Sequence, residues 1–452
     1  MNSTNTLFPL PSTHFLSQPR PSGIASPSSS NSSNSNRVVV DTTTLAAHDF
    51  DVDPRTGFMP PHPPIARLGG VGGENGKYGM YEAWEGILDE ACAGAFRLGR
   101  DIGTETGGRE ERWRGRVREL PILSITPLLD SEPHLRRAHH VLAWILHFYI
   151  HTHESGTEEV RIPPPITLPL LRVSREMHLP PLLTYSDDVL YNWGLNPQNS
   201  SLRVLTSFTS TASESHFYLT SARIELIGVR ALGLMQDSLD ELFVGDDIAR
   251  TRITGFLGEL AGVVGEMEEE LGRMYGGCDV AVFYDEIRPW FQGESEEKRW
   301  VFEGIEMDPE LDSLEYPKEL GGPSAGQSSL IHALDIFLGV EHQHHTSDTD
   351  PDSTFLSRMQ LYMPRHHRNF LSHLREQSRR RSLRAAYNSA VTALKKFRDA
   401  HIVLVARYII GPAARAKGNG EKDREALKGT GGTHLARFLK SVRDNTRDAV
   451  IQ

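Results

Sequence analysis

Residues 385–410 read AAYNSAVTALKKFRDAHIVLVARYII and contain neither glycine nor proline. Nothing in this stretch interrupts a helix, because the two residues that most strongly oppose helix formation are absent. Its apolar positions recur at spacings of three and four residues, which places them on one helical face together with His401; they are Leu394, Phe397, Leu404 and Tyr408. The pattern predicts a long helix that directs the imidazole of His401 into a core.

Helical spacing recurs through most of the chain after residue 41, whereas no window shows the sustained alternation of a β-strand. A Gly-Gly pair at 276–277 ends one helical stretch, and residues 293–318 are polar enough to form a loop. We therefore predict an all-α fold, with further helices over Tyr81–Leu98, His134–His151, Phe217–Met235, Ile253–Met274 and Ser328–Val340.

The chain has 452 residues, more than the roughly 250–300 that one hydrophobic core organises, so we expect two packed domains. Residues 1–45 are rich in Ser, Asn and Pro, which predicts a disordered tail. A mitochondrial transit peptide is the alternative, but the tail holds only Arg20 and Arg37 and no lysine. We place a small helical domain at 46–205 and a large helical domain at 206–452, with the boundary in the Ser/Thr/Asn-rich stretch 196–215.

The composition excludes several classes of function. Lys and Arg number 48 against 59 Asp and Glu, and the net charge of −11 repels nucleic acid and anionic membranes. Cys92 and Cys278 are the only cysteines, which excludes a disulfide framework and a thiolate zinc site and fits a reducing compartment. The longest apolar run, Val141–Ile150, is far shorter than the ~20 residues that span a bilayer. We expect a cytoplasmic protein without nucleic-acid or membrane partners.

His401 has two interpretations from its spacing alone. A buried imidazole needs a partner, because an unpaired buried polar group costs ~1–3 kcal/mol. His401 is therefore either a core histidine bonded to a neighbouring carbonyl or the ligand of a metal. Arg398 lies one helical turn earlier, where its guanidinium is either an ordinary surface group or the partner of an anionic cofactor edge.

Two glycine-rich runs precede predicted helices. The first, GGPSAGQSS at 321–329, either presents backbone N–H groups to a carboxylate or is a linker. The second, GTGGT at 429–433, is either a lid or a plain loop. The histidines within 342–345 favour a solvated helix end over a zinc site, because consecutive histidines cannot share a helical face. The arginines at 379–381 favour an exposed stretch over a nucleic-acid patch.

Several of these stretches together resemble the indoleamine 2,3-dioxygenase family. Residues 363–371, MPRHHRNFL, resemble its MPxxHRxFL signature, and residues 386–409 resemble its proximal-histidine helix. The runs at 324–329 and 429–433 match two further family elements in the same order. The similarity covers most of the chain from about residue 50.

The resemblance implies an all-α protein in which a small amino-terminal domain caps a large domain that binds one haem b. It implies a dioxygenase that inserts both atoms of O₂ across the indole 2,3-bond of L-tryptophan to give N-formylkynurenine, the first step of the kynurenine route to NAD. It further implies an external reductant, and we expect a monomer.

Carried over position by position, the resemblance makes His401 the proximal ligand of the haem iron. Phe283 would pack on the indole, and the planar fork of Arg288 would hold the substrate carboxylate with two hydrogen bonds. The implied cofactor-binding residues are His401, Arg398, Ser324 and Ala325, the catalytic residues are Ser221, Phe283 and Arg288, and the substrate-binding residues are Tyr185, Phe217, Phe283, Arg288 and Thr430.

Three residues depart from the family pattern. Tyr284 stands where many relatives have phenylalanine, and Pro323 replaces a loop glycine. Asp188 stands where relatives carry a small or apolar pocket residue, and a carboxylate facing the indole would weaken tryptophan binding because it must lose its water. The alternative function is a haem-binding member with weak or no tryptophan turnover, acting as a gas sensor or on another indole.

Overall fold

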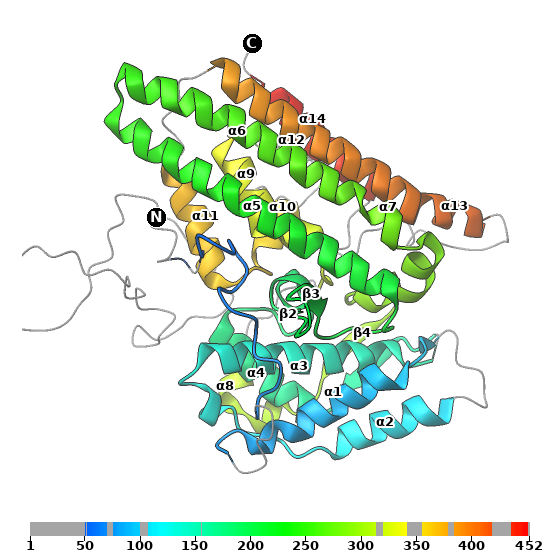
Figure 1. Cartoon of the computed structure of the whole chain (residues 1–452). Coiled ribbons are helices and arrows are strands. Elements are labelled where there is room, and N and C mark those ends of the chain that lie inside the picture. Colours follow the sequence, from blue (N-terminus) through cyan, green and yellow to red (C-terminus); the bar gives the residue numbers. More distant parts are fainter. Residues whose placement is uncertain are drawn as a thin grey trace, which may run out of the picture.

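The computed structural model describes residues 50, 52–69, 76–99, 107–154, 156–312, 320–340, 355–377, 384–417 and 435–450. Within them the protein is mostly helical, and the helices form two layers, one above the other in Figure 1. Four predictions fall outside the described residues: the tail at 1–45, the histidines within 342–345, the arginines at 379–381 and the run at 429–433 that includes Thr430.

The lower layer in Figure 1 is organised around α3 (Glu132–His151), which is buried from Leu135 to its end and confirms the helix predicted over 134–151. Helices α1 (Glu82–Gly94) and α4 (Pro164–Met177) pack against α3, and α2 (Gly107–Glu119) packs against α1 and α4. Helix α1 ends before the predicted Leu98 because Ala95 adopts a left-handed conformation, with a φ of 44°.

The upper layer is a long hairpin of α5 (Ala212–Val244) and α6 (Asp247–Gly272), with α12 (Arg384–Val405) lying along α6. Helix α5 starts earlier than predicted because Thr211 caps it and Glu214 binds the chain just before the cap. The Thr211 hydroxyl accepts a hydrogen bond from the Glu214 N–H at 3.2 Å, and the Glu214 carboxylate accepts two from Phe208 and Thr209, both at 2.7 Å.

Shorter elements connect and cover the two layers. Four of them are single turns that matter for the site: residues 186–190, 282–287, 288–291 and 406–410, the last of which continues α12. The remaining helices are α7 (Met274–Gly277), α8 (Pro309–Asp312), α9 (Ser329–Phe337), α10 (Phe355–Gln360), α11 (Arg365–Gln377), α13 (Gly411–Lys417) and α14 (Leu435–Asp448).

The protein is mostly helical, as predicted, but the described residues also form four short strands that the all-α prediction lacks. Strand β1 (Glu159–Ile162) pairs in parallel with β4 (Arg299–Phe302), and β2 (Trp193–Leu195) pairs in antiparallel fashion with β3 (Leu202–Val204). Each strand is three or four residues long, too short for an alternating pattern to stand out. The predicted loop over 293–318 is wrong where it contains β4 and α8.

Two large hydrophobic clusters fill most of the interior. One gathers α1, α3 and α4 and also takes in Phe208, Tyr218 and Trp290, while the other gathers α5, α6, α9 and α12. The rings of Phe208 and Trp290 stack at 5.0 Å with an angle of 5°. Residues after 206 thus complete the core of the lower layer, and the division into domains 46–205 and 206–452 stays a prediction.

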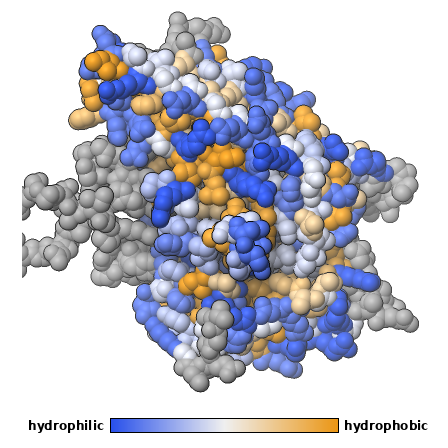
Figure 2. All heavy atoms as spheres, viewed as in Figure 1, coloured by the Kyte–Doolittle hydropathy of each residue, from blue (hydrophilic) through white to orange (hydrophobic). Residues whose placement is uncertain are grey.

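The surface carries an apolar tip at the α5–α6 turn, where Phe243, Val244 and Ile248 are exposed; Figure 2 shows it at the upper left. In the part of the chain that the structure describes, no helix is long and apolar enough to cross a membrane. Both cysteines are free.

Candidate functional site

The predicted seam of α12 faces the interior, as its spacing requires. Leu394, Phe397 and Tyr408 are buried, and His401 is half-buried between them. The His401 imidazole has no hydrogen-bond partner among the described residues. Desolvation, with a smaller contribution from the Arg398 guanidinium, lowers the pKa of His401 to about 4. At neutral pH the side chain is therefore an uncharged imidazole, the form that binds a metal.

Arg398 is not a surface residue, so that alternative from the sequence is wrong. Its guanidinium is 7% exposed and donates to both carboxylate oxygens of Asp335 on α9, at 2.6 and 2.7 Å. It also donates to the Thr446 hydroxyl on α14. Asp399, the other charged neighbour of His401, pairs with Lys395 at 2.5 Å. The structure thus gives Arg398 a fixed position one turn before His401, and the Asp399 carboxylate is engaged by Lys395.

An aromatic wall joins α5, the turn 282–287 and the end of α12. The Phe283 ring lies 5.0 Å from Phe217 and 5.7 Å from Tyr408, and the Phe217 ring stacks on Phe291 at 5.8 Å. The Tyr408 hydroxyl donates to the Cys278 carbonyl at 2.7 Å, which fixes the ring. Ser221 follows Phe217 by one helical turn and is half-buried. The structure therefore brings the predicted residues Phe217 and Phe283 into contact.

Arg288 directly follows the turn that carries Phe283. It is 7% exposed, and its guanidinium carbon lies 5.8 Å from the centre of the Tyr284 ring. The backbone just after Arg288 packs closely against the run at 321–329. The contact is so tight that a Cβ atom on Gly322 would collide with the Phe291 carbonyl. The glycine-rich run therefore buttresses the segment that carries Arg288.

His147 on α3 contacts two segments of the site, and the sequence analysis did not predict this role. Its Nδ1 atom contacts the Trp290 carbonyl at 2.8 Å, and its Nε2 atom accepts a hydrogen bond from the Leu183 N–H at 3.3 Å. Burial lowers the pKa of His147 to about 4, so the ring is neutral and can donate on one side and accept on the other. His147 thus ties the segment after Arg288 to the segment before Tyr185.

Glu225 is a second residue that sequence reasoning missed. It is 2% exposed, and its Oε1 atom accepts hydrogen bonds from the hydroxyls of Tyr185 at 3.0 Å and Ser328 at 2.7 Å. Burial raises its pKa to about 7. The spacing in the sequence could have identified it, because Glu225 follows Phe217 and Ser221 at the same interval of four residues and so lies near their face of α5.

The run at 321–329 leads into a helix, as the sequence predicts. Ser328 caps α9 through a hydrogen bond from the Ile331 N–H at 3.4 Å, and Gln327 accepts one from the Tyr185 N–H at 2.8 Å. Ser324 is half-buried and Ala325 is exposed. The run is therefore pinned to the predicted pocket residue Tyr185, which argues against a mere linker.

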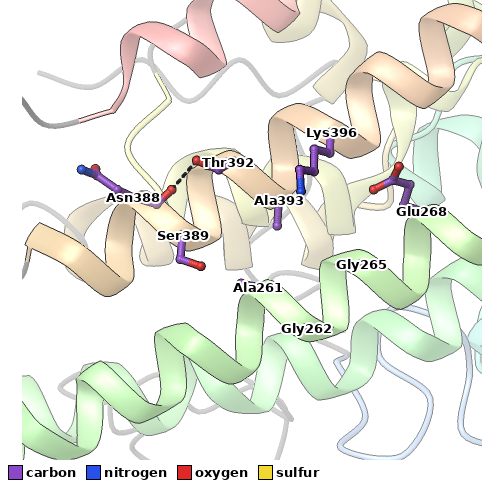
Figure 3. A pocket seen from close by; sticks show the side chains of 9 residues that line it. All are labelled: Ala261, Gly262, Gly265, Glu268, Asn388, Ser389, Thr392, Ala393 and Lys396. Carbon is purple, nitrogen blue, oxygen red and sulfur yellow. Dashed lines mark hydrogen bonds between the residues drawn. The ribbon is translucent and has the colours of Figure 1, made fainter.

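A surface groove of about 620 Å³ lies elsewhere, between α6 and α12 (Figure 3). Small residues of α6 form its floor, and Lys396 and Glu268 stand at one end. None of the predicted site residues lines it. The groove is a shallow feature of the bundle surface, separate from the residues described above.

The arrangement fits the haem that the sequence leads us to expect. His401 offers a neutral imidazole that no described residue engages, and Arg398 supplies a buried cation one turn away. His216, at the start of α5, contacts the Arg273 carbonyl through Nε2 at 2.9 Å, and its Nδ1 atom lies against Gly277, where an added Cβ atom would be 2.3 Å away. The aromatic wall of Phe217 and Phe283 offers an apolar lining for a flat ring system.

Comparisons with known proteins identify the family of the chain. The family model for indoleamine 2,3-dioxygenase matches residues 46–449. An indoleamine 2,3-dioxygenase from Aspergillus candidus is 32% identical over 90% of this chain and 98% of its own length. The indoleamine 2,3-dioxygenase of Saccharomyces cerevisiae is 34% identical over 71% of this chain and 79% of its own. A 6-hydroxytryptophan 2,3-dioxygenase from Fusarium equiseti is 28% identical over 89% and 97%. The chain therefore belongs to the indoleamine 2,3-dioxygenase family and is an oxidoreductase.

Proposed function

We propose that this protein is a haem dioxygenase that inserts both atoms of O₂ across the indole 2,3-bond of L-tryptophan to give N-formylkynurenine, the first step of the kynurenine route to NAD. The observation that carries the proposal is the His401 imidazole, which is neutral, half-buried and without a hydrogen-bond partner among the described residues. An imidazole in that state on an apolar seam is suited to hold a haem through its iron.

The cofactor is one haem b per chain, which, when bound, supplies the iron chemistry that activates O₂. His401 would hold the iron, and the Arg398 guanidinium, fixed by Asp335, would pair with a haem propionate. Ser324 and Ala325 would contact the cofactor. The protein acts as a monomer, and an external reductant would supply the electrons that the cofactor needs.

The residues of the chain bind the substrate, orient it and exclude water. Arg288 holds the carboxylate, and Phe217 and Phe283 hold the indole between aromatic faces. Tyr185 forms the floor, fixed by Glu225. Ser221 lies beside the reacting ring, and Thr430 closes over the ammonium group. A dry aromatic site keeps the substrate in one orientation, which is the main contribution that the protein makes to such a reaction.

A spectrum of the purified, haem-reconstituted protein tests the cofactor half of the proposal. The wild-type protein should show a Soret band, and His401→Ala should lose it. The matched control is His134→Ala, because His134 is half-buried but contacts Ser131 and Tyr78 on the far layer. A Soret band that persists in His401→Ala would reject this histidine as the ligand.

Turnover with ascorbate as the reductant tests the other half, followed by the absorbance of N-formylkynurenine. Arg288→Ala should raise the KM for tryptophan by about 100-fold and spare the Soret band, because a carboxylate clamp contributes two charge-assisted hydrogen bonds. Arg299→Ala is the control, since Arg299 is exposed and pairs with Glu159. Unchanged kinetics in Arg288→Ala would reject the clamp.

A second candidate is turnover of a different indole, with weak activity on tryptophan itself. The observation that favours it is Asp188, whose carboxyl group is buried next to Tyr185. One relative of similar length is a 6-hydroxytryptophan 2,3-dioxygenase. Comparing tryptophan with hydroxylated tryptophans in the same assay separates the two candidates.

A further inference from the structure

The apolar tip at the turn between α5 and α6 presents three large side chains to solvent together. Phe243 is 91% exposed, Val244 is 62% exposed and Ile248 is 64% exposed. They lie within six residues of one another in the sequence and form the orange group at the upper left of Figure 2. Apolar side chains that are exposed as a group mark a surface to which another segment or molecule binds.

The turn that carries the apolar tip is fixed by its own contacts. Gly245 adopts a left-handed conformation with a φ of 73°, and its N–H donates to the Glu241 carbonyl at 3.0 Å. The Asp246 carboxylate caps α6 by accepting a hydrogen bond from the Ala249 N–H at 2.7 Å. Arg252 on α6 pairs with Glu241 on α5 at 2.8 Å and so joins the two helices. The exposure of the apolar tip is therefore a property of the fold and not of a loose loop.

Acidic residues surround the apolar tip. The segment 236–252 contains five acidic residues and two arginines. Both arginines form ion pairs at 2.8 Å within the segment, which leaves Asp237 and Asp240 without an ion pair among the described residues. This charge repels the same tip of a second copy and an anionic membrane surface. A segment that covers the tip should therefore be apolar and positively charged.

The described part of the chain begins beside the same helical hairpin. The Phe50 ring stacks on His373 of α11 at 5.2 Å. Gly57 lies against α5, where an added Cβ atom would be 3.4 Å from Leu232 Cδ1. From Leu232 to Phe243 is 11 residues, which is about 17 Å along a helix. The chain that precedes residue 50 therefore enters the fold in the layer that carries the apolar tip.

A short segment before this entry point has the required chemistry. Residues 37–40 lie outside the described residues and read RVVV, and no acidic residue occurs before Asp41. Val40 is ten residues from Phe50, and ten extended residues reach up to about 33 Å. The apolar residues at 7–10 would close a loop about four times as long, which costs more entropy. Residues 37–40 are therefore the nearest part of the tail that matches the tip.

We propose that residues 37–40 bind to the apolar tip, with their valines on Phe243, Val244 and Ile248 and the Arg37 guanidinium beside the exposed acids. The contact anchors the amino-terminal tail to the α5–α6 hairpin and closes the tip to other molecules. It involves neither the cofactor nor the substrate, so it stands or falls independently of the proposed function.

Photo-crosslinking of the full-length protein tests this contact. The photoreactive residue p-benzoyl-phenylalanine replaces Phe243, and because that side chain is 91% exposed, the replacement leaves the core intact. After irradiation, mass spectrometry should find one main crosslink, within a single chain, to residues 37–40. Arg37→Glu should lower its yield about two- to fivefold, the value of one exposed ion pair. Replacing all three valines by serine should lower it at least about tenfold.

The matched control carries the same probe at Met307, which is also apolar and is 61% exposed; it should give no crosslink to residues 37–40. A crosslink from position 243 to the arginines at 379–381, to another part of the tail or to a second copy would overturn the assignment. So would the absence of a crosslink, or a yield that the valine substitutions leave unchanged.

Discussion

Two buried histidines of α3 and two buried carboxyl groups near α5 differ in how completely the fold pairs them. On α3, His139 uses both ring nitrogens, with Asp187 and the Pro180 carbonyl at 2.8 and 3.1 Å, and His147 also uses both. Near α5, Asp188 Oδ1 and Glu225 Oε2 are buried without partners. Because an unpaired buried polar group costs stability, the fully paired histidines serve to hold the fold, whereas Asp188 and Glu225 each keep one buried oxygen unpaired.

The largest loss of stability is expected from breaking the buried ion pair between α3 and α1. Arg137 donates to both carboxylate oxygens of Glu85, at 3.0 and 2.6 Å, and Glu85 is 0% exposed. Arg137→Leu should lower the free energy of unfolding by about 3–5 kcal/mol, because it leaves the buried Glu85 carboxylate without a cation and with the Leu68 N–H at 2.8 Å as its remaining partner. Urea denaturation followed by circular dichroism measures this.

The control for that variant is Arg230→Leu, which removes the exposed pair with Glu266 and should cost no more than about 1 kcal/mol. Equal losses in the two variants would show that the α3 pair has no special role in the stability of the lower layer.

His147→Leu should cost about 2–4 kcal/mol in the same denaturation assay, because the Trp290 carbonyl and the Leu183 N–H both lose a buried partner. It should also raise the KM for substrate, since these two segments carry Arg288 and Tyr185. His147→Gln, which can still donate and accept, should recover part of both losses. A variant with normal stability and kinetics would remove His147 from the set of positioning residues.

These contacts explain which parts of the fold and of the site could be predicted from the sequence. The stripes of α5, α6 and α12 were predictable because the residues that share a face are close in sequence. The His147 contact with Trp290 spans 143 residues and the Glu225 contact with Ser328 spans 103, and no local pattern encodes such pairs. Phe217 and Arg288 were assigned through the family resemblance alone, since an isolated phenylalanine or arginine carries no signal of a pocket.

The buried carboxyl group of Glu225 should make the stability of the protein depend on pH. Its pKa is about 7 in the folded protein against 4.5 in the unfolded chain. Between these values the folded state binds the extra proton, so Glu225 contributes stability that is present below pH 4.5 and lost as the pH rises through 7. Glu225→Gln removes this dependence, and its stability relative to the wild-type protein should improve by roughly 2–3 kcal/mol between pH 5 and pH 8.

Urea denaturation of the haem-free proteins at a series of pH values measures that difference. Glu266→Gln, at an exposed ion pair, is the control and should show a flat difference. The neutral histidines of α3 affect wild type and variant alike, so they cancel. A flat difference for Glu225→Gln as well would mean that Glu225 is charged in the folded protein, and that its site is more polar than its burial implies.

The smallest change in the free energy of unfolding is expected for two glycine substitutions, which differ in the space around the new side chain and not in hydrogen bonds. Gly262 is exposed on α6 at the groove of Figure 3, and a Cβ atom there would meet nothing within 4 Å. Gly262→Ala should therefore raise the free energy of unfolding by about 1 kcal/mol, because alanine restricts the unfolded chain and favours a helix. Gly228→Ala on α5 should instead lower it by about 1–3 kcal/mol, because its Cβ would collide with Leu330. Thermal unfolding of the two variants measures these changes. A gain in stability for Gly262→Ala with a loss for Gly228→Ala would show that the groove is open space on the bundle surface, whereas α5 is closely packed against α9 near Glu225. A gain in both variants would mean that α9 can move away from α5.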